Sequence, residues 1–156
     1  MWRTPHHIIS SEPLQKGGKT DDFFFLESDG DAAQKLVCDL VTTRLPRSYG
    51  FDPVRDIQVL CPHQAGPTGT QALNVELQNL LNPEQKGKPQ LQSASRVFRV
   101  GDKVMQVRNN YEIVWNRIGG EQGVGAYNGD IGIVESINMR DRSMVVRMDD
   151  RRLLYP

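Results

Sequence analysis

The string Gly17-Gly18-Lys19-Thr20 suggests phosphate chemistry, because it resembles the end of a nucleotide-binding P-loop. A complete P-loop needs another glycine five residues before Gly18, so that the backbone can curl around the phosphates, and a helix that opens behind it. Here Pro13 occupies that position, and two aspartates follow the string, whose charges would repel a triphosphate. The string therefore predicts a polar loop.

Histidines and paired acids form no pattern that predicts a metal or catalytic site. His6 and His7 are adjacent, and His63 is far away, with no cysteine or carboxylate at ligand spacing. Adjacent residues on regular structure cannot easily face one metal ion. The acid pairs Asp21–Asp22 and Asp149–Asp150 are typical of solvated loops. We expect no metal site and no self-contained catalytic centre in this sequence.

Residues 56–83, DIQVLCPHQAGPTGTQALNVELQNLLNP, predict a strand over 56–61, a loop rich in Gly and Pro, and a helix. In wound α/β sheets, ligands bind at the carboxyl ends of strands, where loop amides and a helix N-terminus face an anion. The pattern alone favours the alternative, a plain connection between a strand and a helix.

A second segment, residues 98–111, ends in Arg108, Asn109, Asn110 and Tyr111, and a turn at 127–132 contains Asn128 beside another tyrosine. A cation, amides and an aromatic ring at one strand end could bind single-stranded nucleic acid. The alternative is a hairpin whose asparagines cap turns and whose tyrosine fills the interior of the fold.

The elements around these segments differ between the two halves of the chain. In the first half, strands are expected at 22–27 and 56–61, and helices at 30–45, ended by Pro46, and from 69 until Pro83, with four leucines on one face of the second helix. Strand, helix, strand, loop and helix is the order of a parallel sheet wound with helices. The leucines are Leu73, Leu77, Leu80 and Leu81.

Residues 82–95 are polar, contain two prolines and predict a loop or linker. Residues 96–156 then show short β-rich stretches with tight turns, including a hairpin turn at 139–143 between strands at 133–137 and 144–148. This half predicts a small SH3-like barrel. We therefore divide the chain into residues 1–95 and residues 96–156.

Composition narrows the class of protein. The 19 basic and 19 acidic residues cancel, which excludes a histone-like protein that binds by bulk charge. Residues 1–95 carry a net charge of −2 and residues 96–156 a net charge of +2. No apolar run is long enough for a membrane span or a signal peptide, and the two cysteines are too few for a disulfide framework. We expect a cytoplasmic protein that does not contact membranes.

Together, QVLCPHQAGPTGTQALNVELQNLLNP, FRVGDKVMQVRNNYEIVW and YNGDIGIVESI resemble the RecD-like ATP-dependent DNA helicases of superfamily 1, which include the alpha subunit of exodeoxyribonuclease V. DDFFFLE, TTRLP and YGFDPVRDIQVL follow the same order, so the resemblance covers residues 6–156. It implies an α/β fold with a partial RecA-like parallel sheet, part of the second motor domain, and an inserted SH3-like barrel.

The resemblance also implies a function. The family hydrolyses ATP with Mg²⁺, moves 5′ to 3′ along single-stranded DNA and unwinds duplex DNA in repair or recombination, in some members within a nuclease complex. In this sequence the ATP cleft would include His63, Gln64 and Gly66, and the DNA-facing edge Arg108, Asn109, Asn110, Tyr111 and Asn128. Many relatives carry Arg or Lys at the positions of residues 63–65, where an arginine could reach the γ-phosphate. This sequence has His63, Gln64 and Ala65 instead, so that role is not transferred.

The P-loop and the acidic motif of the family do not occur in these 156 residues. The sequence is therefore expected to be part of a longer helicase, to bind neither ATP nor Mg²⁺ alone and to hydrolyse no ATP alone. It would contact DNA and the rest of the helicase chain. The alternative function is a non-enzymatic SH3-like module that binds a protein partner. A stand-alone nucleotide-binding protein is disfavoured because the P-loop is missing.

Overall fold

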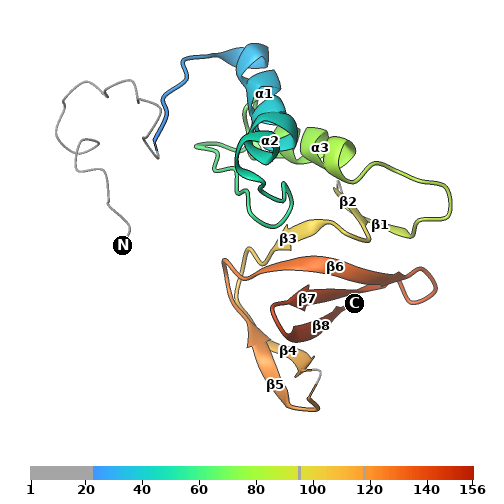
Figure 1. Cartoon of the computed structure of the whole chain (residues 1–156). Coiled ribbons are helices and arrows are strands. Elements are labelled where there is room, and N and C mark those ends of the chain that lie inside the picture. Colours follow the sequence, from blue (N-terminus) through green and yellow to red (C-terminus); the bar gives the residue numbers. More distant parts are fainter. Residues whose placement is uncertain (1–22, 95, 118) are drawn as a thin grey trace.

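The computed structural model describes residues 23–94, 96–117 and 119–156. The helices lie on one side of the molecule, and the antiparallel strands lie on the other (Figure 1). None of the helices in the described part of the chain has the length and apolar character that crossing a membrane requires. The predicted P-loop-like string and His6 and His7 lie outside the described residues.

The first helix runs further than the sequence predicted. It comprises α1 (Gly30–Asp39), a π-helical turn η2 (Leu40–Arg44) and α2 (Leu45–Tyr49). Pro46 was expected to end the helix, but it occupies the first turn of α2, where a missing N–H is tolerated. The wider η2 turn, closed by Leu45 N–H donating to Leu40 O, leads into it. The helix ends instead at Gly50, whose left-handed φ of 73° favours glycine.

The second predicted helix is confirmed as α3 (Thr70–Leu81). Leu73 is buried, but Leu80, on the same helical face, is 54% exposed. Leu77 and Leu81 are half-buried, so the described residues cover the leucine face only in part.

The two strands expected in the first half are not present in the described residues. Residues 23–27 and 56–61 form no strand, and every paired strand in the described part of the chain is antiparallel. A strand needs a neighbour that satisfies its backbone hydrogen bonds, and the described residues offer these segments none. Their apolar side chains remain at the surface: Leu60 is 87% exposed, and Phe24 and Phe25 are about half exposed. The structure therefore shows no RecA-like parallel sheet.

The segment interpreted as a linker contains a strand. Within residues 82–95, β1 (Gln90–Ser93) forms and pairs with β2 (Arg96–Arg99) as an antiparallel hairpin. Apart from Leu91, which is buried, β1 has polar side chains, so its composition gave no strand signal.

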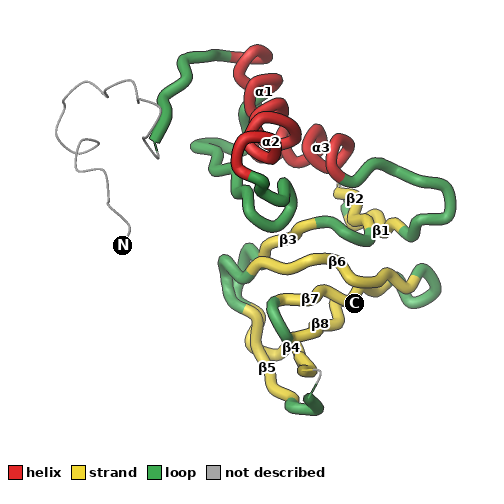
Figure 2. The backbone as a smooth tube through the Cα atoms, viewed as in Figure 1, coloured by secondary structure: helices red, strands yellow, loops and turns green. Residues whose placement is uncertain are grey.

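Six strands form the second sheet in the order β3-β6-β7-β8-β4-β5, and the predicted hairpin between β6 and β7 is confirmed. Every neighbouring pair is antiparallel, as expected for an SH3-like barrel. Figure 2 shows this all-strand half curling below the helices. We refer to residues 103–155 as the barrel. The strands are β3 (Lys103–Met105), β4 (Asn110–Arg117), β5 (Gln122–Ala126), β6 (Ile131–Asn138), β7 (Ser143–Met148) and β8 (Arg151–Tyr155).

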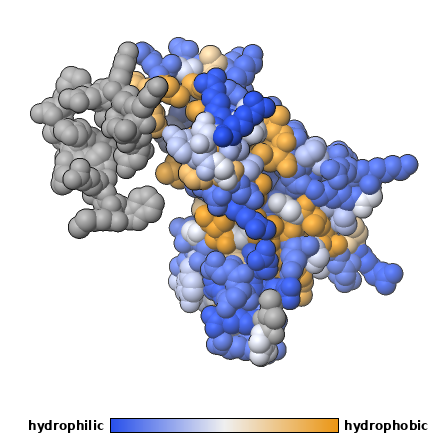
Figure 3. Space-filling model, viewed as in Figure 1, coloured by the Kyte–Doolittle hydropathy of each residue, from blue (hydrophilic) through white to orange (hydrophobic). Residues whose placement is uncertain are grey.

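Side chains from five of these strands form the apolar core of the barrel, which contains Ile113, Ala126, Val134, Val146, Met148 and Leu153. Gly132 is required for its packing, because a Cβ there would lie 2.6 Å from Val146 Cγ1 and 2.8 Å from the Arg147 carbonyl oxygen. The core holds the sheet rigid beneath the loops that join its strands. On the face seen in Figure 3, hydrophobic side chains are also exposed between the helices and the sheet.

Candidate nucleic-acid interface

Two loops of the barrel meet side by side at the start of β4. Gln106 N–H donates to Asp130 O, and Gly129 N–H donates to Gln106 O, both at 2.8 Å. These bonds join residues 106–111, between β3 and β4, to the turn 127–130, between β5 and β6. The sequence-predicted DNA residues are therefore brought together from two separate parts of the chain.

Asn109 links the two loops through its side chain. Its Oδ1 accepts a hydrogen bond from Asn128 N–H, and its Nδ2 donates one to the Tyr111 hydroxyl, each at 2.8 Å. Both ends of this amide are thus engaged inside the protein. Asn109 serves to position Tyr111 and the turn.

The two tyrosines form the exposed part of this surface. Tyr111 is 64% exposed and Tyr127 is 49% exposed. Their rings pack edge to face, with centroids 6.0 Å apart and planes at 74°. The alternative in which Tyr111 fills the interior of the barrel is therefore wrong. Exposed rings fixed in orientation provide the faces on which bases stack.

Arg108 and Asn110 have different roles in the loop. The Arg108 side chain is exposed, and its backbone carbonyl accepts a hydrogen bond of 2.6 Å from Gln106 Nε2. Asn110 Oδ1 accepts the backbone N–H groups of Glu112 and Ile113, each at 3.2 Å, so this side chain caps the bend at the start of β4. For the asparagines at 109 and 110, the turn-capping interpretation is confirmed.

Below the turn, Tyr155 and Asp130 support the surface. Tyr155 Oη donates to Gln106 Oε1 at 2.9 Å. Burial raises the pKa of the Tyr155 phenol, and the negative charge of Asp130 raises it further, so the hydroxyl stays protonated as a donor. Asp130 Oδ2 also accepts Tyr127 N–H at 3.0 Å and lies 3.6 Å from Arg151. The interactions of Tyr155 and Asp130 thus support the two loops that carry Tyr111 and Tyr127.

Sequence reasoning did not find the supporting residues Gln106, Asp130 and Tyr155. The sequence places Tyr127 beside the predicted residue Asn128 but does not itself predict a role for it. The signal for Asp130 was its place in Asn128-Gly129-Asp130, where Gly129 has a φ of +96° and closes a tight turn. Nothing in the sequence connects Tyr155 with Gln106, because 49 residues separate them.

The predicted ATP-cleft residues lie on the loop before α3. Thr70 N–H donates to His63 O at 3.2 Å, and Gln71 N–H donates to Gln64 O at 3.1 Å. These two amides of the helix N-terminus are therefore occupied by the loop itself. His63 Nε2 also lies 3.5 Å from Thr68 Oγ1, while the side chains of His63 and Gln64 are exposed. Any ligand here would meet those side chains before the two amides.

Replacing Gly69 by alanine is expected to open this loop. A Cβ at Gly69 would lie 2.4 Å from Ala65 O and 2.5 Å from Gln64 O, both backbone atoms that cannot move aside alone. Such overpacking costs about 1–3 kcal/mol. Urea denaturation and faster amide exchange at Gln71 would measure the effect. The Gly119→Ala variant, whose added Cβ meets no atom within 4 Å, is the matched control and should change neither value.

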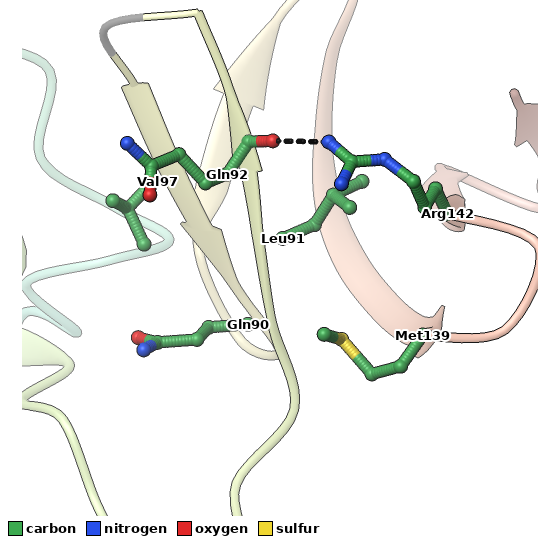
Figure 4. Close-up of a pocket in the computed structure, with 6 residues that line it drawn as sticks. All are labelled: Gln90, Leu91, Gln92, Val97, Met139 and Arg142. Carbon is green, nitrogen blue, oxygen red and sulfur yellow. Dashed lines mark hydrogen bonds between the residues drawn. The ribbon is translucent and has the colours of Figure 1, made fainter.

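A shallow hollow of about 290 Å³ lies between the β1–β2 hairpin and the β6–β7 turn (Figure 4). Arg142 Nη2 donates to Gln92 O across it at 3.1 Å. None of the predicted site residues lines this hollow. Within the described residues there is also no group of three or more His, Cys, Asp or Glu side chains that could hold a metal ion.

Comparison with known proteins gives two matches. Residues 73–148 match the family model described as the ATP-dependent RecD-like DNA helicase SH3 domain. The chain is also 37% identical over 129 residues to the ATP-dependent RecD2 DNA helicase of Deinococcus radiodurans, an alignment that includes 83% of this chain. Both matches support a fragment of a RecD-like DNA helicase.

The RecD-like chain spans 15% of the length of that Deinococcus relative. The matched family domain includes most of the barrel and both loops that carry the tyrosine surface, and it begins inside α3. The resemblance inferred from the sequence is thereby confirmed, and so is the SH3-like nature of the antiparallel half of the RecD-like chain.

Proposed function

We propose that the barrel binds single-stranded DNA as part of an ATP-dependent helicase that moves 5′ to 3′ in DNA repair or recombination. The observation that carries this proposal is the pair Tyr111 and Tyr127, two exposed rings whose orientation is fixed by Asn109 and by each other. Stacking on aromatic rings suits any DNA sequence, because every base has a π-face. A motor that translocates along DNA needs such a sequence-tolerant contact.

Arg108 supplies the positive charge of this surface. Its exposed side chain is on the same loop as Tyr111, where it can meet a phosphate while a base stacks on the ring. The backbone N–H of Asn128 is occupied by Asn109, so Asn128 would contact DNA through its exposed side chain.

For residues 23–94 we propose a place in the second RecA-like motor domain. Residues 57–61 alternate between half-buried and exposed side chains, which is the periodicity of a strand. Their exposed apolar side chains, and those of residues 23–26, fit strands whose neighbours come from elsewhere in a longer helicase. His63, Gln64 and Gly66 would then lie at the edge of a cleft that binds ATP and Mg²⁺ mainly through other parts of that protein.

Fluorescence anisotropy of a labelled dT oligonucleotide, titrated with this chain, tests the proposal. We expect binding that weakens between roughly 50 and 200 mM salt. Each phosphate contact on a single strand contributes about 0.7 to the slope of log affinity against log salt, so one contact gives about a 2.6-fold loss over that range. The affinity should be similar for mixed-sequence oligonucleotides of equal length.

Absence of binding at both salt concentrations would contradict a DNA-binding barrel and would favour a module that binds a protein partner. Binding with no salt dependence would contradict the assignment of Arg108 to a phosphate. The Arg108→Ala variant provides the matched test, because it should retain stacking while losing the slope contributed by one contact.

A further inference from the structure

A buried carboxylate lies where α3 meets the barrel. Asp102 is 8% exposed and occupies the turn between β2 and β3. The backbone of this turn is fixed to β6, because Gly101 N–H donates to Val134 O at 2.8 Å and Val134 N–H donates to Asp102 O at 2.9 Å. Asp102 is therefore attached to the barrel through its main chain.

The side chain of Asp102 faces the opposite way, toward α3. Its Oδ2 accepts Gln78 Nε2 at 2.5 Å and Arg99 N–H at 2.7 Å, and its Oδ1 accepts Asn82 Nδ2 at 2.6 Å. Gln78 and Asn82 are four residues apart and so lie on one face of the helix end. A buried carboxylate is stable only with such a set of donors.

The same side chains also bond to the backbone around Asp102. Gln78 Nε2 donates to Val97 O at 2.8 Å, and Asn82 Nδ2 donates to Val100 O at 3.1 Å. Arg99, also 8% exposed, donates back to α3, to Asn79 Oδ1 at 3.2 Å and to Asn82 O at 3.0 Å. We call Gln78, Asn79, Asn82, Arg99 and Asp102 the α3 joint.

The α3 joint differs in chemistry from the barrel core. The apolar core cluster consists entirely of barrel residues between 113 and 153. The α3 joint, in contrast, is built from directional hydrogen bonds made by two buried charged groups, the Asp102 carboxylate and the Arg99 guanidinium. Directional bonds fix an angle between two bodies more strictly than apolar contact, which permits sliding.

From this geometry we infer that Asp102 is a positioning residue that fixes the orientation of the barrel on α3. The loop 63–69 is bonded to the N-terminus of α3, and the Asp102 turn leads through β3 into the loop that carries Tyr111. The loop 63–69 and the loop that carries Tyr111 therefore keep a fixed position relative to each other. That the first loop faces ATP and the second faces DNA rests on the proposed function, but the fixed position of the two loops does not.

Pulsed electron resonance on the whole chain tests the inference. Spin labels at Asn74→Cys on α3 and Asn116→Cys on β4 would be placed in a background with Cys38→Ser and Cys61→Ser. We expect one narrow distance distribution in this parent. The Asp102→Ala variant should broaden and shift that distribution, while the NMR resonances of the Trp115 indole and the core methyl groups stay in place.

A charge swap supplies the control. In Asp102→Asn one amide NH₂ replaces an accepting oxygen, so that a donor of the α3 joint faces another donor. In the double variant Asn82→Asp/Asp102→Asn, the new amide at position 102 can donate to the new carboxylate at position 82, while its oxygen still accepts from Gln78 and Arg99. Lys88 Nζ, which contacts Asn82 Oδ1, balances the moved charge. We expect the narrow distribution to return in part in the double variant, because Val100 O loses the donor that Asn82 Nδ2 supplies.

Two results would overturn the inference. One is an unchanged distance distribution in both Asp102→Ala and Asp102→Asn. The other is loss of the barrel resonances in these variants, because Asp102 would then support the barrel itself and not its orientation. The oligonucleotide titration tests a separate statement. If the parent chain binds no DNA but Asp102→Ala still broadens the distance distribution, the proposed function is wrong and the role of the α3 joint stands.

Discussion

Replacing Tyr111 by alanine is expected to weaken binding of single-stranded DNA by about 5- to 150-fold, because one base stacked on an aromatic side chain contributes ~1–3 kcal/mol. The ring is 64% exposed, so its removal leaves no cavity in the core. The barrel should therefore unfold at nearly the same urea concentration as the parent. Anisotropy titrations with a dT oligonucleotide measure the affinity.

Two further variants separate the ring from its hydroxyl and from general surface effects. Tyr111→Phe keeps the ring but removes the acceptor of the Asn109 hydrogen bond, so a smaller loss is expected. Tyr49→Ala removes another half-exposed tyrosine, which stacks on Phe51 on the helical side of the molecule, and should leave affinity unchanged. Equal affinities for Tyr111→Ala and the parent would refute the stacking surface.

The largest effect on stability is expected at Leu153, in the centre of the barrel. Its side chain is fully buried, and its register partners are Trp115 on β4 and Val146 on β7. Truncation of a buried leucine to alanine costs about 2–5 kcal/mol, because transfer energy is lost and a cavity remains. Urea denaturation of Leu153→Ala, followed by far-UV circular dichroism, measures the loss.

Leu154 provides a control of the same residue type on the same strand. It is 58% exposed, so Leu154→Ala should change the free energy of unfolding by less than about 0.5 kcal/mol. If both variants lose equal stability, Leu153 is not the centre of the core. Leu153→Ala should bind DNA as the parent does under conditions where the barrel is folded. A loss of affinity there would contradict the view that Leu153 contributes to stability and not to the DNA-binding surface.

The elements that the sequence predicted well depend on local signals. The helix at 70–81 and the hairpin around 139–143 are defined by apolar periodicity and turn residues that lie within the elements themselves. The tyrosine surface was predicted in part for the same reason, since four of its predicted residues are consecutive at 108–111. Such features need no knowledge of distant parts of the chain.

The features that the sequence did not predict depend on partners far away. Residues 23–27 and 56–61 have the composition of strands, but a strand forms only beside another strand, and the described residues provide none. The reverse holds for β1, whose polar residues become a strand because β2 lies next to them. Composition reports what a segment can form, and pairing decides what it does form.

The role of Asp102 shows the same limit for side chains. In the sequence it follows Gly101 and fits an ordinary turn, and that turn is present. Its carboxylate, however, bonds to Gln78 and Asn82, residues 20 or more positions earlier. Amides at the end of a leucine-rich helix give no indication of the charge that they will meet.

The strand order has a consequence for how the chain folds during synthesis. The strands β6, β7 and β8 are consecutive and can pair as soon as they emerge from the ribosome. In contrast, β4 pairs at one edge with the next strand, β5, but its other edge needs β8, made more than 30 residues later, and β3 needs β6. Long-range pairing forms more slowly than local hairpins, because a longer loop must close first. One edge of β4, the strand that carries Tyr111, therefore stays unpaired until β8 is translated, and this interval is when the nascent barrel is most open to misassembly.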